Sequence, residues 1–274
     1  ELVYSAESPY QNLYVTREGS VLTLRAGSLR ARSSALDLDA PGRHVIEYTG
    51  LMMVGLGYVG ELEKVLVLGL GGGTLTRTLR RYYPRSEITN VEIDGEVVRI
   101  ARDHFGFRPD TRMALAVEDA RRFLARTTDT YDLILLDAYH GDYIPFHLLT
   151  REFLELVRGR LNPGGAVVAN TWSHQQLYHR ESATYAAVFG SFDSYLGREA
   201  DNRIVVARKD GVDLPYPELQ RRMAETQGRK AFAELDLPTL LERHFDRELS
   251  WPADTPVLVD DYAPVNFLVG SEAR

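Results

Sequence analysis

The sequence has no cysteine, no long apolar run and no excess of basic residues. Without cysteine, its 274 residues can form neither disulfides nor cysteine-ligated metal sites. No run of about eighteen apolar residues is present, so no segment of the chain reads as a membrane span. A net charge of −7 gives no basic surface for nucleic acid, and the seven histidines form no evident metal set. These absences favour a cytoplasmic globular protein that binds neither nucleic acid nor a metal ion.

The chain begins at Glu1 rather than at methionine, which leaves open a membrane-embedded segment outside it. In that case we expect the cytoplasmic face of a membrane as its location. A length of 274 residues with 44% hydrophobic content suffices for one large domain with a small appendage.

Two regions with different sequence patterns follow one another. Residues 1–40 contain short strand-like segments and form a small N-terminal β-strand region. In residues 41–274 apolar segments alternate with helical ones, and a helical appendage is expected near 210–250. Such alternation, with almost purely apolar strands, predicts an α/β fold whose mostly parallel sheet carries helices on both faces. The expected strands are 65–68, 88–92, 114–117, 133–136, 166–170 and 203–207, and the expected helices are 74–83, 95–104, 120–126, 147–160 and 176–189.

A glycine-rich turn follows the first strand of this domain. Its glycines permit a tight turn and a close approach to a ligand before a helix begins near Thr74. Glu92 ends the next strand, about 20 positions further on, where such folds hold ribose hydroxyls. The pattern predicts a site for an adenosine-containing molecule. A dinucleotide-dependent dehydrogenase is disfavoured, because the third glycine of G-x-G-x-x-G would fall on Thr74.

Polar residues also follow the later strands, at the sheet edge where ligands of open parallel sheets bind. Asp119 either caps the following helix or accepts the adenine amino group, and the residues alone favour neither. Asp137 follows an apolar strand, where an unpartnered carboxylate would be costly to bury, so we favour a functional role. His140 and Asp142 lie on the next loop, where a histidine is either structural or catalytic.

Together these motifs resemble the spermidine synthase (polyamine aminopropyltransferase) family over roughly residues 8–207. Residues 8–11 (SPYQ) resemble its S-x-Y-Q entry, and 69–73 (GLGGG) stand at its G-G-G-D-G. Residues 91–94 (VEID) match its ribose-binding motif, 118–120 (EDA) its adenine-binding G-D-G/A, and 137–140 (DAYH) its catalytic D-S-S-D.

The resemblance implies a Rossmann-like, class I methyltransferase fold and a set of site residues. For the nucleoside it implies Gln11, Gly69, Gly71, Gly72, Gly73, Glu92, Asp94, Glu118, Asp119 and Ala120. For catalysis it implies Asp137, Tyr139, His140 and Asp142. The substrate would be S-adenosylmethionine or its decarboxylated form, with no metal, and the acceptor a polyamine.

The departures from the family pattern lie on the amine side of the site. Gly72 stands where the family has an aspartate that attracts the ammonium of decarboxylated S-adenosylmethionine, and His140 replaces the last aspartate of D-S-S-D. The aromatic-Q/H-E segment reads Glu47-Tyr48-Thr49. We expect Gly72 to remove a charge and create room, so that S-adenosylmethionine itself becomes a plausible ligand.

The C-terminal residues 260–266 (DDYAPVN) resemble the ending of spermidine synthase-like domains that are often fused to membrane transporter-like segments. The N-terminal strands, too few to form a core alone, could pair between subunits of a homodimer.

The first hypothesis is transfer of an aminopropyl-type group to an amine, with release of methylthioadenosine. In this hypothesis Asp137 orients the reacting groups, while His140 or Asp142, with help from Tyr139, acts as general base. The alternative is self-cleavage of S-adenosylmethionine to methylthioadenosine and a lactone. Methyl transfer and a non-catalytic nucleoside sensor are further alternatives, because the fold alone does not choose among them.

Overall fold

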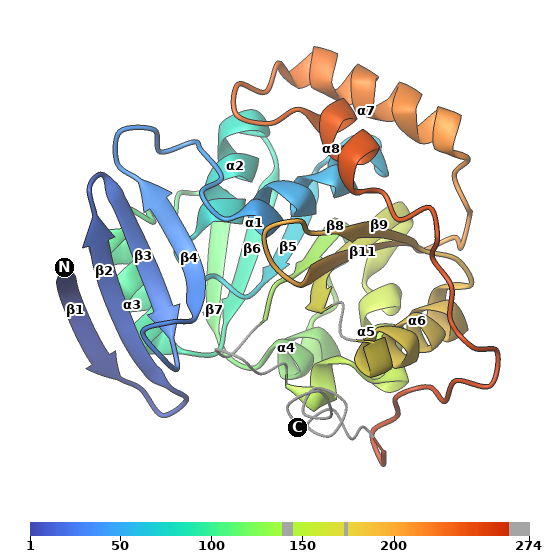
Figure 1. Cartoon of the computed structure of the whole chain (residues 1–274), viewed down its shortest axis with the longest axis horizontal. Coiled ribbons are helices and arrows are strands. Elements are labelled where there is room, and N and C mark those ends of the chain that lie inside the picture. The colour runs from blue at the N-terminus through green and yellow to red at the C-terminus, as the bar shows by residue number, and fades with distance from the viewer. Residues whose placement is uncertain (139–144, 173–174, 263–274) are drawn as a thin grey trace.

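The computed structural model describes residues 1–138, 145–172 and 175–262. The chain begins with a small antiparallel sheet of four strands (Figure 1). The strands are β1 (Leu2–Glu7), β2 (Asn12–Glu18), β3 (Val21–Ala26) and β4 (Arg32–Asp37), paired in that order. Apolar side chains of this sheet, such as Leu13 and Leu24, form one buried cluster with Val97 and Phe105 of the larger domain. The predicted N-terminal strand region is confirmed, and it shares its core with the rest of the chain.

The second sheet has seven strands in the order β10-β11-β9-β8-β5-β6-β7. Five strands run parallel, and β10 and β11 complete one edge as an antiparallel pair. This order is that of a Rossmann-like, class I methyltransferase fold, as predicted. The strands are β5 (Lys64–Leu68), β6 (Glu87–Glu92), β7 (Met113–Val117), β8 (Tyr131–Leu136), β9 (Leu161–Trp172), β10 (Asp193–Leu196) and β11 (Asn202–Arg208).

Helices cover both faces of this sheet (Figure 1). Alternate residues of β5 point to opposite faces, so Val65 and Val67 belong to one buried cluster while Leu66 and Leu68 belong to another. The first cluster includes side chains of α1 (Glu47–Leu51), η1 (Met52–Gly57), α2 (Thr74–Tyr82), α7 (Tyr216–Lys230) and α8 (Leu237–His244). The second includes side chains of α4 (Ala120–Arg126), α5 (Arg151–Gly159) and α6 (Gln175–Phe189), while α3 (Gly95–His104) packs on the N-terminal sheet.

Two details differ from the sequence expectation. The helix expected over 147–160 is divided into η2 (Phe146–Leu148) and α5, because the Thr150 side chain caps α5 by accepting from the Phe153 amide. Strand β10 was not expected, since its residues carry no apolar run long enough to indicate a strand. Among the described residues, no helix is both long and apolar enough to cross a membrane.

The loop after β5 lies at the point where the strand order reverses. Strand β5 pairs with β6 on one side and with β8 on the other, so a crevice opens at the carboxyl ends of β5 and β8. Gly69 has a positive φ of 96°, and a β-carbon built there would lie 2.1 Å from the backbone oxygen of Asp137. Only glycine allows the chain to turn this close to the end of β8.

Gly69→Ala should lower the free energy of unfolding by about 2 kcal/mol or more, because it adds a backbone clash to the strain of a positive φ. Gly71→Ala is the matched control: its φ is 51°, but the nearest atom to an added β-carbon is 3.5 Å away. The control should cost only about 1 kcal/mol. Urea unfolding of both variants checks this, and equal losses would show that the Asp137 backbone does not constrain the turn.

Candidate active site

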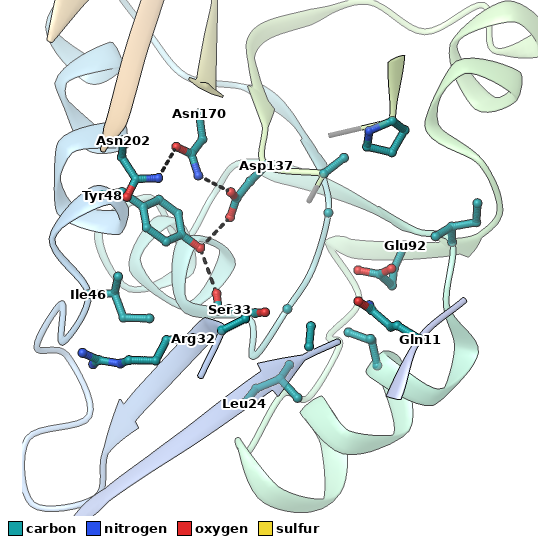
Figure 2. Close-up of a pocket in the computed structure, with 18 of the residues that line it drawn as sticks. Gln11, Leu24, Arg32, Ser33, Ile46, Tyr48, Glu92, Asp137, Asn170 and Asn202 are labelled. Carbon is teal, nitrogen blue, oxygen red and sulfur yellow. Dashed lines mark hydrogen bonds between the residues drawn. The ribbon is translucent and has the colours of Figure 1, made fainter. Parts of the chain in front are cut away.

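A cavity of about 680 Å³ lies at the carboxyl ends of the central strands. Its volume is in the range of small-molecule sites, which is roughly 300–1,000 Å³. The N-terminal sheet closes one side with Gln11 and Leu24, and the loop between β10 and β11 closes another with residues 199–202. The two sheets therefore enclose the site together (Figure 2).

The structure brings most of the described candidate residues to this cavity. Those that line it are Gln11, Gly69, Gly71, Glu92, Glu118, Asp119, Ala120 and Asp137. Gly72, Gly73 and Asp94 are not among its lining residues. The predicted catalytic residues Tyr139, His140 and Asp142 lie outside the described residues.

Gly72 and Asp94 have structural surroundings that the motif did not indicate. A β-carbon at Gly72 would lie 2.8 Å from both Cδ1 of Phe105 and Oγ of Ser34, so the expectation that Gly72 creates room in the site is wrong. Asp94 is 1% exposed, caps α3 through the Glu96 amide at 2.9 Å, and accepts from Ser8 Oγ at 2.6 Å. Through these two hydrogen bonds Asp94 links α3 to the segment that contains Ser8 and Gln11.

Glu92 and Gln11 both line the cavity (Figure 2). Glu92 is buried and accepts from the Leu70 amide at 2.9 Å and from the Asp94 amide at 3.1 Å. Burial raises the pKa of Glu92, and these backbone donors oppose the shift. The side-chain oxygen of Gln11 is buried with no hydrogen-bond partner in the described structure. A buried orphan acceptor at a cavity wall is a polar group that a bound ligand can satisfy.

Asp119 caps a helix and also faces the cavity. Its Oδ1 accepts from the Arg122 amide at 2.9 Å, so the capping interpretation is confirmed, while Oδ2 lies 3.1 Å from Nε2 of His147. Its neighbour Glu118 is paired with Arg126, whose Nε donates to Oε2 at 2.9 Å. The adenine role of Asp119 stays a prediction.

Asp137 directly follows β8, and its carboxyl group belongs to a chain of hydrogen bonds (Figure 2). Asn202 donates to Asn170 Oδ1 at 2.9 Å, and Asn170 donates to Asp137 Oδ1 at 3.0 Å. The Tyr48 hydroxyl lies 3.1 Å from Asp137 Oδ2 and 3.0 Å from the Ser33 carbonyl oxygen. All five residues line the cavity.

The Tyr48 hydroxyl has one proton and two acceptors, so the network changes with the charge of Asp137. When Asp137 is ionised, Tyr48 can donate to the carboxylate. When Asp137 is protonated, it can donate to the Tyr48 oxygen, and Tyr48 then donates to Ser33. The geometry therefore accommodates both protonation states of the carboxyl group.

Four residues of this network were not among the predicted site residues: Ser33, Tyr48, Asn170 and Asn202. Asn170 does end a predicted strand, which was a usable signal. Tyr48 and Asn202 lie in segments that meet Asp137 only through the tertiary fold.

Carboxylates outnumber basic side chains on the cavity wall. Those lining it are Glu47, Glu92, Glu118, Asp119, Asp137, Glu199 and Asp201, against two arginines, Arg30 and Arg32. A concave site with walls of one charge sign concentrates ligands of the opposite sign. In the described part of the chain no group of histidine, aspartate and glutamate residues could hold a metal ion.

The fold and the cavity at its switch point define a Rossmann-like, class I methyltransferase-fold protein. The family model described as spermine/spermidine synthase domain matches residues 46–196. A Vibrio vulnificus protein named polyamine aminopropyltransferase is 36% identical over 279 residues, which cover 97% of this chain and 91% of that protein. The chain belongs to the spermine/spermidine synthase family, and the prediction of an aminopropyltransferase-family enzyme is confirmed.

Solved structures agree with this fold. A probable spermidine synthase from Corynebacterium glutamicum has a TM-score of 0.69 at 20% identity, covering 91% of this chain and 99% of that one. A spermidine synthase in complex with the transition state analogue AdoDATO has a TM-score of 0.66 at 20% identity, covering 99% and 87% respectively.

The stability of an Asp137→Asn variant relative to the unsubstituted chain should increase with pH. Burial raises the pKa of Asp137 to about 7, although hydrogen bonds from Asn170 and Tyr48 oppose the shift. In the unfolded chain an aspartate titrates near pH ~3.9, so between the two values only the native state keeps the proton, and stability falls as pH rises. Asparagine removes this dependence.

Urea unfolding should be measured at about pH 5 and about pH 8. Between these two pH values, the free energy of unfolding of the variant should rise by about 2 kcal/mol or more relative to that of the unsubstituted chain. Asp39→Asn, at an exposed aspartate, is the control. A stability difference for Asp137→Asn that is the same at both pH values would contradict the raised pKa.

Proposed function

We propose that this enzyme transfers the aminopropyl group of decarboxylated S-adenosylmethionine to an amine of a polyamine, releasing methylthioadenosine. The observation that carries the proposal is the half-buried carboxyl of Asp137, with its raised pKa, on the wall of an acidic cavity between the Gln11–Glu92 end and the Glu199–Asp201 end. The names of the relatives support the polyamine acceptor, and the analogue-bound neighbour supports the decarboxylated substrate.

The nucleoside would lie at the Gln11–Glu92 end. Carboxylate oxygens of Glu92 can accept both ribose hydroxyls, and the orphan oxygen of Gln11 can accept a further donor. Asp119 Oδ2, which lies 3.1 Å from His147 Nε2, would also accept from the adenine amino group, since a carboxylate oxygen can accept two hydrogen bonds. This arrangement leaves the sulfonium near the carboxyl ends of β5 and β8.

The acceptor would lie at the opposite end, near the loop between β10 and β11. Glu47 Oε2 accepts from the amides of Arg198 and Glu199 at 2.8 and 2.9 Å, which fixes this loop. Glu199 and Asp201 of the same loop line the cavity. Their carboxylates can offset the hydration that an ammonium group loses on entering the site.

The transfer step needs a neutral amine and a placed electrophile. The amine nitrogen forms a bond to the aminopropyl carbon attached to sulfur, the carbon–sulfur bond breaks, and sulfur keeps the electron pair as a neutral thioether. The proton lost by the amine passes to a base. A carboxylate whose pKa is raised to about 7 is suited to that role near neutral pH, because it exchanges protons readily there. Orientation of the two substrates supplies the rest of the acceleration.

Incubation with decarboxylated S-adenosylmethionine and putrescine should give methylthioadenosine and an aminopropylated amine, both detected by mass spectrometry. Asp137→Asn should lower turnover by about 100-fold or more, because the general base is lost. Product from decarboxylated substrate only in the presence of the amine is the expected pattern. Methylthioadenosine from S-adenosylmethionine alone would instead establish self-cleavage, and methyl transfer would give S-adenosylhomocysteine.

Tyr48→Phe should move the acid limb of the kcat/KM profile to higher pH by about one unit, because the carboxylate of Asp137 loses a hydrogen-bond donor. Tyr58→Phe is the matched control, since Tyr58 is also buried but bonds to Asp193 and Tyr195, outside the cavity. A profile that only drops in height, with no shift in pH, would refute the link between Tyr48 and the charge of Asp137.

A further inference from the structure

The segment that follows α8 crosses to the other side of the large sheet, where it lies against α5 and α6 (Figure 1). Leu258 is fully buried, its amide donates to Thr184 Oγ1 of α6 at 3.0 Å, and its carbonyl accepts from the Arg151 amide at 2.8 Å. These contacts place the acidic motif that begins at Asp260 beside the first turns of α4 and α5.

Asp260 binds three groups of the larger domain. Its two carboxylate oxygens accept from Arg121 Nη1 and Nη2 at 2.7 and 2.5 Å, which is a bidentate ion pair. Oδ1 also accepts from Thr150 Oγ1 at 2.7 Å, and the Asp260 amide donates to Glu152 Oε2 at 3.0 Å. The carboxylate therefore joins the start of α4 to the start of α5.

Contacts lead from this ion pair to the cavity. Arg121 Nη1 also donates to the His147 carbonyl oxygen at 3.2 Å, and His147 Nε2 lies 3.1 Å from Asp119 Oδ2. His147 and Asp119 line the cavity, whereas Arg121 and Asp260 do not. Among the described residues, the hydrogen bonds of Asp260 lead to the cavity wall through Arg121, and Asp260 also interacts electrostatically with His147.

The ion pair also determines where the Arg121 guanidinium points. Arg121 has two further carboxylates within its electrostatic reach, Asp119 and Glu152. Held by both oxygens of Asp260, the guanidinium stays in the plane of that pair. Without Asp260 the guanidinium would be drawn toward Glu152 and Asp119, and at Asp119 it would compete with a nucleoside donor.

We propose that Asp260 is a positioning residue for the nucleoside end of the cavity, acting through Arg121 and His147 to keep Asp119 Oδ2 directed at the ligand. This inference rests on the proposed function, because it takes the Asp119 end of the cavity as the nucleoside end. The C-terminal acidic motif, which takes no part in the transfer step, would then have a role in nucleoside binding.

The proposed role of Asp260 concerns nucleoside binding and not the stability of the fold. The side chains of Asp260 and Arg121 are 40% and 25% exposed, so solvent screens their attraction and its contribution to overall stability is small. A change at Asp260 should therefore affect nucleoside affinity more than the unfolding transition. It should also leave the chemistry at Asp137 intact, because no hydrogen bond among the described residues joins Asp260 to the Asp137 network.

Asp260→Asn should weaken methylthioadenosine binding, measured by calorimetry, by about three- to tenfold, and raise the KM for decarboxylated S-adenosylmethionine similarly. Its kcat should stay within about twofold and its unfolding midpoint should change little. Asp261→Asn, at the exposed neighbouring residue, is the matched control, and its affinity for methylthioadenosine should equal that of the unsubstituted chain. The charge-reversed pair Arg121→Glu with Asp260→Arg should recover part of the affinity that either single change loses.

Unchanged affinity in Asp260→Asn would overturn the proposal. Equal losses of kcat, affinity and stability would also overturn it, since they would indicate a merely structural contact. If the unsubstituted chain itself binds no methylthioadenosine, the proposed function fails and this proposal fails with it. If the unsubstituted chain binds methylthioadenosine and Asp260→Asn binds it equally well, only this proposal fails.

Discussion

The site depends on the close approach of the β5 turn to the end of β8. Because β5 and β8 pair in parallel, their carboxyl ends meet, and the Gly69 turn lies directly against the Asp137 backbone. The Asp137 amide donates to the Leu68 carbonyl at 2.8 Å, which extends the sheet pairing into the cavity floor. This contact brings the turn, Glu92 and Asp137 to one crevice, where burial raises the pKa of Asp137.

The partners of Asp137 are neutral donors, and this matters for a site that takes cations. An arginine beside Asp137 would lower its pKa and repel an ammonium or sulfonium group. Asn170 and Tyr48 instead offer hydrogen bonds with no net charge, so burial remains the largest influence on the pKa. The same reasoning accounts for the wall as a whole, where carboxylates outnumber arginines.

Much of the fold was predictable because its signals are local. The apolar segments of β5 and β8, the glycine turn and the acidic end of β6 each depend on a few neighbouring residues. Roles that depend on distant neighbours were not predictable. Asp94 and Gly72 belong to the same motifs as Glu92 and Gly71 but face Ser8 and Phe105 rather than the cavity, and Tyr48 reaches Asp137 across 89 positions of sequence.

The rewritten amine-side segment takes on a different meaning in three dimensions. Glu47 stands in the segment where the family has an aromatic residue, and sequence comparison alone indicates a weakened acceptor site. In the structure Glu47 Oε2 accepts hydrogen bonds from two backbone amides of the β10–β11 loop. This oxygen therefore holds the loop in place and is not directed at an amine. The loop so held presents Glu199 and Asp201 to the cavity. Negative charge at the acceptor end is thus carried by the loop as well as by the helix, and loss of family motif residues need not mean loss of a cationic acceptor.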